Sequence, residues 1–239
     1  MSNQKQQRAE AAIDPISIFY RLSDGHLLRF PGMADFSMDA NGSRITATPV
    51  PDLDDATLDH LFLNQVAPLA MSRQHKLVLH GGAVVVDNAA VAFIGRSGQG
   101  KSTMVAGFAT NGYRFLTDDG LQLLPHDGGW LVSPGPASIR LWDDSNAALM
   151  PADSVVAPPI SYSSKARLLA GRMLEHNSRA LPLRAIYLLD IEERDVLERH
   201  FTTLSDLARQ GIVFRLCYPR DYSRLPAVRT AKHQHAANQ

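Results

Sequence analysis

The sequence predicts an α/β protein with a mixed, largely antiparallel sheet, a phosphate-binding loop (P-loop) and flanking helices, preceded by a small N-terminal β-hairpin sheet and helix. Three observations predict this class. Short β-prone runs near the N-terminus are separated by Asp24-Gly25 and Asn41-Gly42, which are typical of hairpin turns. A glycine-rich run, 95–103, follows an apolar strand and opens a helical pattern. Only Asp87 and Asn88 separate that strand from the one before it, which requires antiparallel pairing rather than a helical crossover.

The composition is that of an ordinary globular protein, with 239 residues of which 45% are hydrophobic and 20% charged. Lys plus Arg and Asp plus Glu both number 24, so no net field favours nucleic acid or an anionic membrane as a partner. The single cysteine, Cys217, excludes an internal disulfide, and no cysteine–histidine spacing indicates zinc. Residues 1–12 lack the apolar core of a signal peptide, and the longest apolar run, 89–94, is far too short to span a membrane. We therefore expect a cytoplasmic protein.

Residues 1–72 are expected to form a small β-rich subdomain with one helix. Alternating runs between 16 and 48 predict its antiparallel sheet. From Asp54 onward, apolar residues recur at helical spacing up to Leu69, with Asp54 as the N-cap. Pro68 is expected to end or kink this helix.

Residues 73–230 are expected to form the P-loop kinase domain. Its predicted elements are strands at 76–80, 82–86 and 91–94, a one-sided helix after the loop that ends at Asn111-Gly112, strands at 113–117, 121–124 and 130–133, a helix at 144–150, a strand at 185–189, a helix at 203–210 and a strand at 212–214. The stretch 151–177 contains prolines and serines with weak periodicity, and we expect a mobile, substrate-facing segment there. Residues 231–239 are expected to be a disordered tail.

Each residue type in the run 95–103 has a reason in phosphate chemistry. The glycines let backbone N–H groups curl around a di- or triphosphate, Lys101 neutralises the β and γ oxygens, and Ser102 offers its hydroxyl to Mg²⁺. The strand before the run and the helix after it place the anion at a positive helix N-terminus. We therefore expect ATP and Mg²⁺ as cofactors, bound by Gly95, Ser97, Gly98, Gln99, Gly100, Lys101, Ser102 and Thr103.

A pair of carboxylates, Asp118 and Asp119, follows the strand after the loop's helix. Because this strand and the strand before the loop should end at one edge of the sheet, the carboxylates are expected to face the loop. One of them, for which we take Asp119, would hold Mg²⁺ together with Ser102, and the other would accept the proton of an attacking hydroxyl, with the two roles open to exchange. The alternative is an exposed Asp-Asp-Gly turn.

Other candidates for chemistry lie on neighbouring elements. His80 ends a strand next to the loop's own strand and is expected to support the site, with a structural histidine as the alternative. Arg140 and Lys165 are candidates for contact with a transferring phosphoryl group, with surface ion pairing as the alternative. The expected catalytic residues are His80, Lys101, Asp118, Asp119 and Arg140.

Taken together, Leu79-His80-Gly81-Gly82-Ala83, the loop 95–103 and the run 112–119 resemble the catalytic domain of HPr kinase/phosphorylase. That family has a histidine before the hairpin, a Gly-Ser-Gly-x-Gly-Lys-Ser loop and a paired Asp at this distance. The resemblance covers residues 77–124 and implies a fold related to phosphoenolpyruvate carboxykinase. It also places His80, Lys101, Ser102, Asp118 and Asp119 at the family's catalytic positions.

Two departures from the family pattern narrow the resemblance. The glutamate-arginine-glycine signature tied to phosphorolysis is not recognisable, and Pro134–Trp142 stands in its place. The large N-terminal domain of the bifunctional enzyme is replaced by residues 16–71. Both features look more like the short stand-alone relatives, which include kinases that phosphorylate a serine of lasso-peptide precursors, and the run 63–69 is similar to that subgroup.

The main functional hypothesis is a Mg-ATP-dependent kinase that transfers the γ-phosphoryl group to a serine hydroxyl of a peptide or small protein, a lasso-peptide precursor included. An ATP-binding, non-catalytic peptide-binding or regulatory protein and a small-molecule kinase are the alternatives. The Leu-Ser-Gly-Gly-Gln motif of transporter ATPases and the Asn-Lys-x-Asp motif of GTPases are absent. The sequence leaves open the acceptor, the phosphoryl donor, the reverse phosphorylase reaction and the oligomeric state, a homo-oligomer included.

Overall fold

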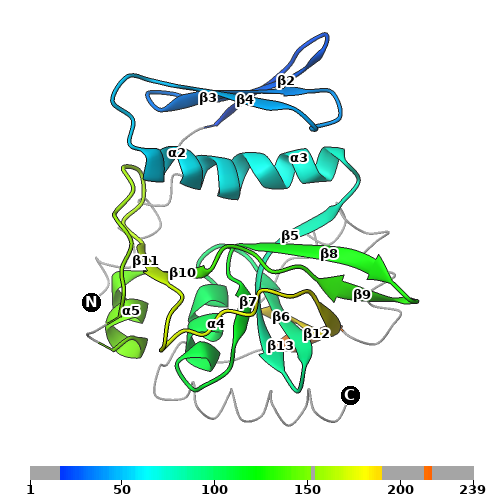
Figure 1. Cartoon of the computed structure of the whole chain (residues 1–239), viewed down its shortest axis with the longest axis vertical. Coiled ribbons are helices and arrows are strands. Elements are labelled where there is room, and N and C mark those ends of the chain that lie inside the picture. The colour runs from blue at the N-terminus through cyan, green and yellow to red at the C-terminus, as the bar shows by residue number, and fades with distance from the viewer. Residues whose placement is uncertain (1–16, 152–153, 190–212, 217–239) are drawn as a thin grey trace. The chain divides into compact units, whose positions relative to one another are not determined.

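The computed structural model describes residues 17–151, 154–189 and 213–216 (Figure 1). The chain divides into two compact units. The N-terminal unit consists of residues 17–75 together with 160–163, and the C-terminal unit consists of the other described residues from 76 onward. Both sheets and helices are present, so the expected α/β class is confirmed. The expected helix at 203–210 and the expected tail at 231–239 lie outside the described residues.

The N-terminal unit is an antiparallel meander packed against helices. Its strands pair in chain order: β1 (Ile18–Arg21), β2 (Gly25–Phe30), β3 (Ala34–Asp39) and β4 (Ile45–Pro49). In β3, Ala34, Phe36 and Met38 are buried and alternate with Asp35, Ser37 and Asp39, which is the alternation expected of this sheet. Gly42 has a φ of 71°, as a hairpin turn requires, whereas Gly25 is needed because a Cβ there would clash with the backbone of β3. The core consists of Leu28, Phe30, Ala34, Phe36, Met38, Leu61, Val66 and Ala70.

The helical part of the N-terminal unit runs without a break through α2 (Asp55–Leu61), the π-helix η1 (Phe62–Val66) and α3 (Ala67–Arg73). Asp54 caps α2 as expected, since its side chain accepts a hydrogen bond of 2.7 Å from the N–H of Thr57. Pro68 does not end the helix. It lies in the first turn of α3, directly after the widened π-helical turn, where a missing N–H is tolerated.

The C-terminal unit is built on one mixed sheet. Its strand order is β13 (Val213–Leu216), β12 (Leu181–Leu189), β6 (Ala89–Gly95), β5 (Leu77–Val86), β8 (Gly120–His126) and β9 (Gly129–Val132), with β7 (Phe115–Thr117) also paired to β5. Strands β5 and β6 form the expected antiparallel hairpin, and its turn residues, Asp87 and Asn88, have φ of 48° and 59°. Strand β12 joins β6 in parallel, and β13 joins β12 in parallel.

Strand β12 closes this sheet on itself. It pairs with β6 from Leu183 onward, and its first residues, Leu181 and Pro182, pair antiparallel with β9. The path from β12 through β6, β5, β8 and β9 therefore returns to β12. Apolar residues from all these strands pack together, while the alternate residues of β5 and β6 belong to a second cluster. Both strands are buried on both faces for this reason, which explains their continuous apolar runs.

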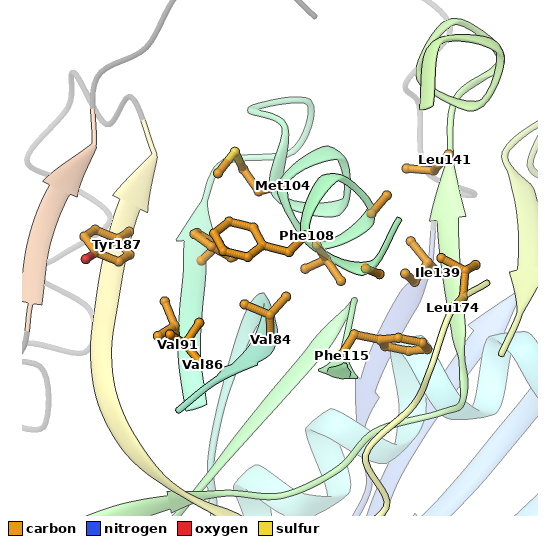
Figure 2. Packing of buried hydrophobic residues seen from close by; sticks show 14 of the residues in the cluster. Val84, Val86, Val91, Met104, Phe108, Phe115, Ile139, Leu141, Leu174 and Tyr187 are labelled. Carbon is orange, nitrogen blue, oxygen red and sulfur yellow. The ribbon is translucent and has the colours of Figure 1, made fainter. Parts of the chain in front are cut away.

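Helix α4 (Lys101–Ala109) packs on the second cluster (Figure 2). Met104 and Phe108 lie over the strands that carry Val84 and Val91. The prediction of a one-sided helix is wrong, because every residue from Met104 to Ala109 is buried. Strand β10 (Ser138–Leu141) contacts α4 as well and contributes Ile139 and Leu141 to the same cluster, so α4 is covered by elements other than the sheet beneath it.

The described residues between β9 and β12 include two more short strands. Strand β10 pairs antiparallel with β11 (Ala166–Leu169), and α5 (Asp143–Leu149) follows β10. The N–H of Ala157 donates to the carbonyl of Arg167 (2.8 Å), and His176 forms an isolated parallel β-bridge with Phe115 of β7. The described part of 151–177 is thus tied to neighbouring strands, and its substrate-facing role stays a prediction. None of the helices in the described part of the chain is long and apolar enough to cross a membrane.

Candidate functional site

The candidate site lies where β5 changes its pairing partner. The first half of β5 pairs with β8 and the second half with β7. Asp118 and Asp119 connect β7 to β8 and therefore lie beside Gly81 and Gly82 of β5. A Cβ on Gly82 would come within 2.5 Å of Val105 Cγ2 and 3.2 Å of the Asp118 carbonyl oxygen. The missing side chain therefore lets α4 and the carboxylate turn approach β5 together.

A second glycine contacts the residue before the carboxylates. The N–H of Gly135 donates to the carbonyl of Leu116 (2.8 Å), and a Cβ on Gly135 would clash with the side chain of Thr117. The Thr117 hydroxyl donates to the carbonyl of the first residue of β8 (2.8 Å). The backbone that leads into Asp118 is thus held between Gly82 and Gly135, and the sequence analysis assigned no role to either glycine. A Gly-Gly pair and a Pro-Gly-Pro loop were the only local signals.

Strand β6 ends at Gly95, and residues 96–100 form the loop between β6 and α4. Gly95 comes close to β12, and a Cβ on it would lie 2.8 Å from the carbonyl oxygen of Leu189. Gly98 and Gly100 have φ of 78° and 85°, a left-handed conformation that favours glycine. The loop ends at the first turn of α4, whose N–H groups have no intrahelical partners. Strands β6 and β7 are both antiparallel to β5, so they end at one edge, as expected.

Lys101 begins α4 and is buried. Its Nζ donates to the carbonyls of Gly95 (2.9 Å) and Arg96 (2.7 Å). Burial and the nearby ammonium of Lys165 lower the pKa of Lys101 to about 8, and the two carboxylates oppose that shift. The ammonium is therefore mostly charged at neutral pH and lies within electrostatic reach of both carboxylates.

Asp118 is the buried member of the pair, with 3% of its surface exposed. Its Oδ2 accepts a hydrogen bond of 2.8 Å from the backbone N–H of Arg140, and its Oδ1 has no hydrogen-bond partner among the described residues. Burial and the charge of Asp119 raise the pKa of Asp118 to about 7, while the N–H of Arg140, the Ser102 hydroxyl and the Lys165 ammonium oppose the rise. A buried carboxylate oxygen that the protein does not satisfy is suited to a cation.

Asp119 is more accessible, and its Oδ2 lies 3.6 Å from an Arg140 guanidinium nitrogen. Its backbone carbonyl accepts a hydrogen bond of 3.0 Å from Nδ1 of His80, so the proton of the neutral ring is on Nδ1. Desolvation of the ring, followed by the charge of Lys101, lowers the pKa of His80, although part of the residue is exposed. His80 is therefore neutral at pH 7, with Nε2 as its acceptor nitrogen.

Lys165 belongs to the site more closely than its sequence indicated. Its charge affects the pKa values of His80, Lys101 and Asp118. The side chain is partly buried, and its Nζ lies 5.1 Å from the centroid of the Trp142 ring. A single lysine in a stretch without clear periodicity carries no sequence signal that separates it from a surface lysine.

The structure gathers most of the predicted residues in the C-terminal unit: His80, Lys101, Ser102, Asp118, Asp119 and Arg140. Thr103 instead faces α5, where its hydroxyl lies 3.3 Å from that of Ser145. Ser97 and Gly98 are exposed on the loop, and the N–H of Gln99 bonds back to the loop carbonyl of residue 96 (3.3 Å). No group of three or more His, Cys, Asp or Glu is placed to hold a metal ion in the part of the chain that the structure describes.

Comparison with known proteins adds little to this description. No protein-family model matches the chain, and no curated protein matches it. Among solved structures, the Hpr(Ser) kinase/phosphatase from Coxiella burnetii is similar with a TM-score of 0.39 and 14% identity, over 69% of this chain and 100% of that chain. A likeness of this size establishes neither a family nor a function, so the function proposed below depends on the residues of this chain.

Proposed function

We propose that this protein is a Mg-ATP-dependent kinase that transfers the γ-phosphoryl group to a serine hydroxyl of a peptide or small protein. One observation carries the proposal. A glycine-rich loop that leads into a helix through Lys101 meets a buried carboxylate, Asp118, whose Oδ1 lacks a hydrogen-bond partner among the described residues. A donor-rich loop for phosphates and a carboxylate for a cation are the two halves of a phosphoryl-transfer site.

Residues 95–100 and the start of α4 would supply the phosphate contacts. N–H groups at a helix N-terminus have no intrahelical partners and carry partial positive charge, which favours phosphate. Lys101 now donates to two neutral loop carbonyls. Charged phosphate oxygens are stronger acceptors than carbonyls, so we expect the ammonium to turn to the nucleotide when it binds.

Ser102 and Asp118 are the residues that would hold Mg²⁺. Both offer oxygen ligands, which Mg²⁺ prefers, and a Mg²⁺ site needs only one or two carboxylates when phosphates and water complete it. From the sequence we expected Asp119 to be the carboxylate ligand. We assign Asp118 instead, because the Ser102 hydroxyl forms a hydrogen bond with the carboxylate of Asp118. When bound, the ion would neutralise the charge that develops on the phosphate oxygens.

Asp119 is the proposed general base. Its carboxylate is accessible enough to meet a hydroxyl, and it lies beside the neutral ring of His80 and the guanidinium of Arg140. In the transfer, the bond between the acceptor oxygen and the γ-phosphorus forms and the bond from that phosphorus to the ADP oxygen breaks. The hydroxyl proton moves to Asp119, and Arg140 offsets negative charge on the transferring group.

The serine acceptor is the part of the proposal that depends on sequence resemblance. The segments 79–83, 95–103 and 112–119 resemble HPr kinase/phosphorylase. The chain has no recognisable phosphorolysis signature, and in this it is similar to the short relatives that act on lasso-peptide precursors. A protein that binds ATP without transferring its phosphoryl group is the alternative. One assay separates the two.

The test incubates the full chain with Mg²⁺, γ-labelled ATP and peptides that end in serine. We expect labelled phosphopeptide together with ADP. Lys101→Met should abolish nucleotide binding, and Asp119→Asn should lower the transfer rate by about 100-fold while ATP affinity changes by less than about threefold. Asp127→Asn, in the exposed β8–β9 turn, is the matched control and should behave as wild type. Unchanged transfer by Asp119→Asn would remove the proposed base, and ATP binding without phosphopeptide or ADP would favour the binding protein.

A further inference from the structure

The register of β10 and β11 brings Lys165 opposite Trp142. Leu141 pairs with Ala166, so the next pair beyond the two strands is Trp142 with Lys165. The Lys165 ammonium lies 5.1 Å from the centroid of the Trp142 ring, which is within the range of a cation–π interaction. The backbone pairing therefore sets this contact, as it does for cross-strand neighbours in general.

Trp142 has a fixed place relative to the carboxylates. It comes two residues after Arg140, whose N–H donates to Oδ2 of Asp118. Its own carbonyl accepts the N–H of Asn146 in the first turn of α5 (2.8 Å). The side chain is nevertheless exposed, with 40% of the residue's surface accessible. Core packing does not account for a large aromatic ring at this junction of strand and helix.

Lys165 also interacts electrostatically with Lys101, the lysine expected to bind phosphate. Ile139 and Leu141 face the core, so Arg140 and Trp142 lie on the opposite face of this extended segment, where Arg140 Nη1 is 3.6 Å from Oδ2 of Asp119. Lys165, held against Trp142, therefore lies on the side of the carboxylates. The charge of Lys165 disfavours the charged form of Lys101, so the two ammonium groups repel each other. A polyphosphate bound between them would offset that repulsion, because its negative charge attracts both ammonium groups.

From this geometry we infer that Trp142 is a positioning residue that holds Lys165 as a second lysine of a polyphosphate-binding site, beside Lys101. The inference depends on the proposed function only for the identity of the anion, the phosphate chain of a nucleoside triphosphate. Holding a flexible lysine against an aromatic face reduces the side-chain entropy that is lost when the anion binds.

The experiment measures the affinity of the full chain for inorganic tripolyphosphate and for Mg-ATP by calorimetry. We expect Lys165→Met and Trp142→Leu each to weaken binding by about five- to tenfold. Trp142→Phe keeps an aromatic face and should stay within about twofold of wild type. The double variant Trp142→Leu with Lys165→Met should bind no more weakly than Lys165→Met alone. Lys76→Met, at an exposed lysine before β5, is the matched control and should leave the affinity unchanged.

Thermal unfolding of the same variants checks that folding is intact. The inference fails if Trp142→Leu binds tripolyphosphate as wild type does, if Trp142→Phe binds as weakly as Trp142→Leu, or if the losses of the two single variants multiply in the double variant. If the wild type binds tripolyphosphate and the variants weaken binding as expected, but the wild type transfers no phosphoryl group, the proposed kinase activity is refuted and this inference stands. A wild type that binds neither probe refutes both.

Discussion

Gly82→Ala tests whether the site depends on the missing side chain where β5 changes partner. The new Cβ would lie 2.5 Å from Val105 Cγ2, whereas carbon atoms in contact are normally about 3.5–4.0 Å apart. Val105 is fully buried and β-branched, so it has no easy rotamer in which to move away. Because overpacking of a core costs about 1–3 kcal/mol, we expect Gly82→Ala to lower the free energy of unfolding by about 2 kcal/mol.

Val105→Ala supplies the compensating change. Alone it removes two buried methyl groups, which costs about 2–3 kcal/mol when the cavity is included. In the double variant the new Cβ at position 82 fills part of the vacated space, and only the contacts of 3.2 Å to the carbonyl oxygens of Thr117 and Asp118 remain tight. The double variant should therefore be more stable than the sum of the single effects by about 1–3 kcal/mol.

Urea unfolding followed by tryptophan fluorescence measures the stability of the C-terminal unit, because both tryptophans, Trp130 and Trp142, belong to that unit. Gly171→Ala is the control, because a Cβ there meets no atom within 4 Å, and it should stay within about 0.5 kcal/mol of wild type. The reasoning is refuted if Gly82→Ala is as stable as this control. It is also refuted if the effects of Gly82→Ala and Val105→Ala add to within about 0.5 kcal/mol.

Three further changes probe other parts of the chain. Asp118→Asn should stabilise the C-terminal unit at pH 8 in EDTA by on the order of 2–4 kcal/mol, because the pKa raised to about 7 makes ionisation oppose folding as pH rises. The difference in the free energy of unfolding between Asp118→Asn and wild type, measured by urea unfolding, should vanish below about pH 4. An equal difference at pH 8 and below pH 4 would contradict the raised pKa of Asp118. Thr57→Val leaves the N–H of Ser161 without its acceptor (3.0 Å), which costs about 1–3 kcal/mol, so proteolysis near 160–163 should be faster than in Thr57→Ser. Asn88→Gly, at a φ of 59°, should raise the urea midpoint by the equivalent of about 0.5 kcal/mol, while Asn88→Val should lower it.

Features of the fold that depend on neighbouring residues were predictable. The β5–β6 hairpin follows from two turn residues that tolerate positive φ, and the N-cap at Asp54 follows from a short acceptor side chain before a helical pattern. The prediction of a one-sided α4 was wrong because it treated the helix alone, and the helix that contains Pro68 does not end there, although an end was one of the two outcomes expected. Helix α4 is covered by both β5 and β10, and Pro68 falls just after a π-helical turn that no local pattern announces.

By itself, the sequence determined which chemical groups the site contains and their order along the chain. The loop glycines, Lys101 and the Asp118-Asp119 pair were recognisable because their spacing belongs to one continuous strand–loop–helix–strand segment. Only the tertiary structure decided that Asp118 is the buried carboxylate, that Gly82 makes room for the turn that carries it, and that the charge of Lys165 acts on the same residues. Each of these depends on strand register and on the meeting of segments distant in sequence, which residue spacing alone does not encode.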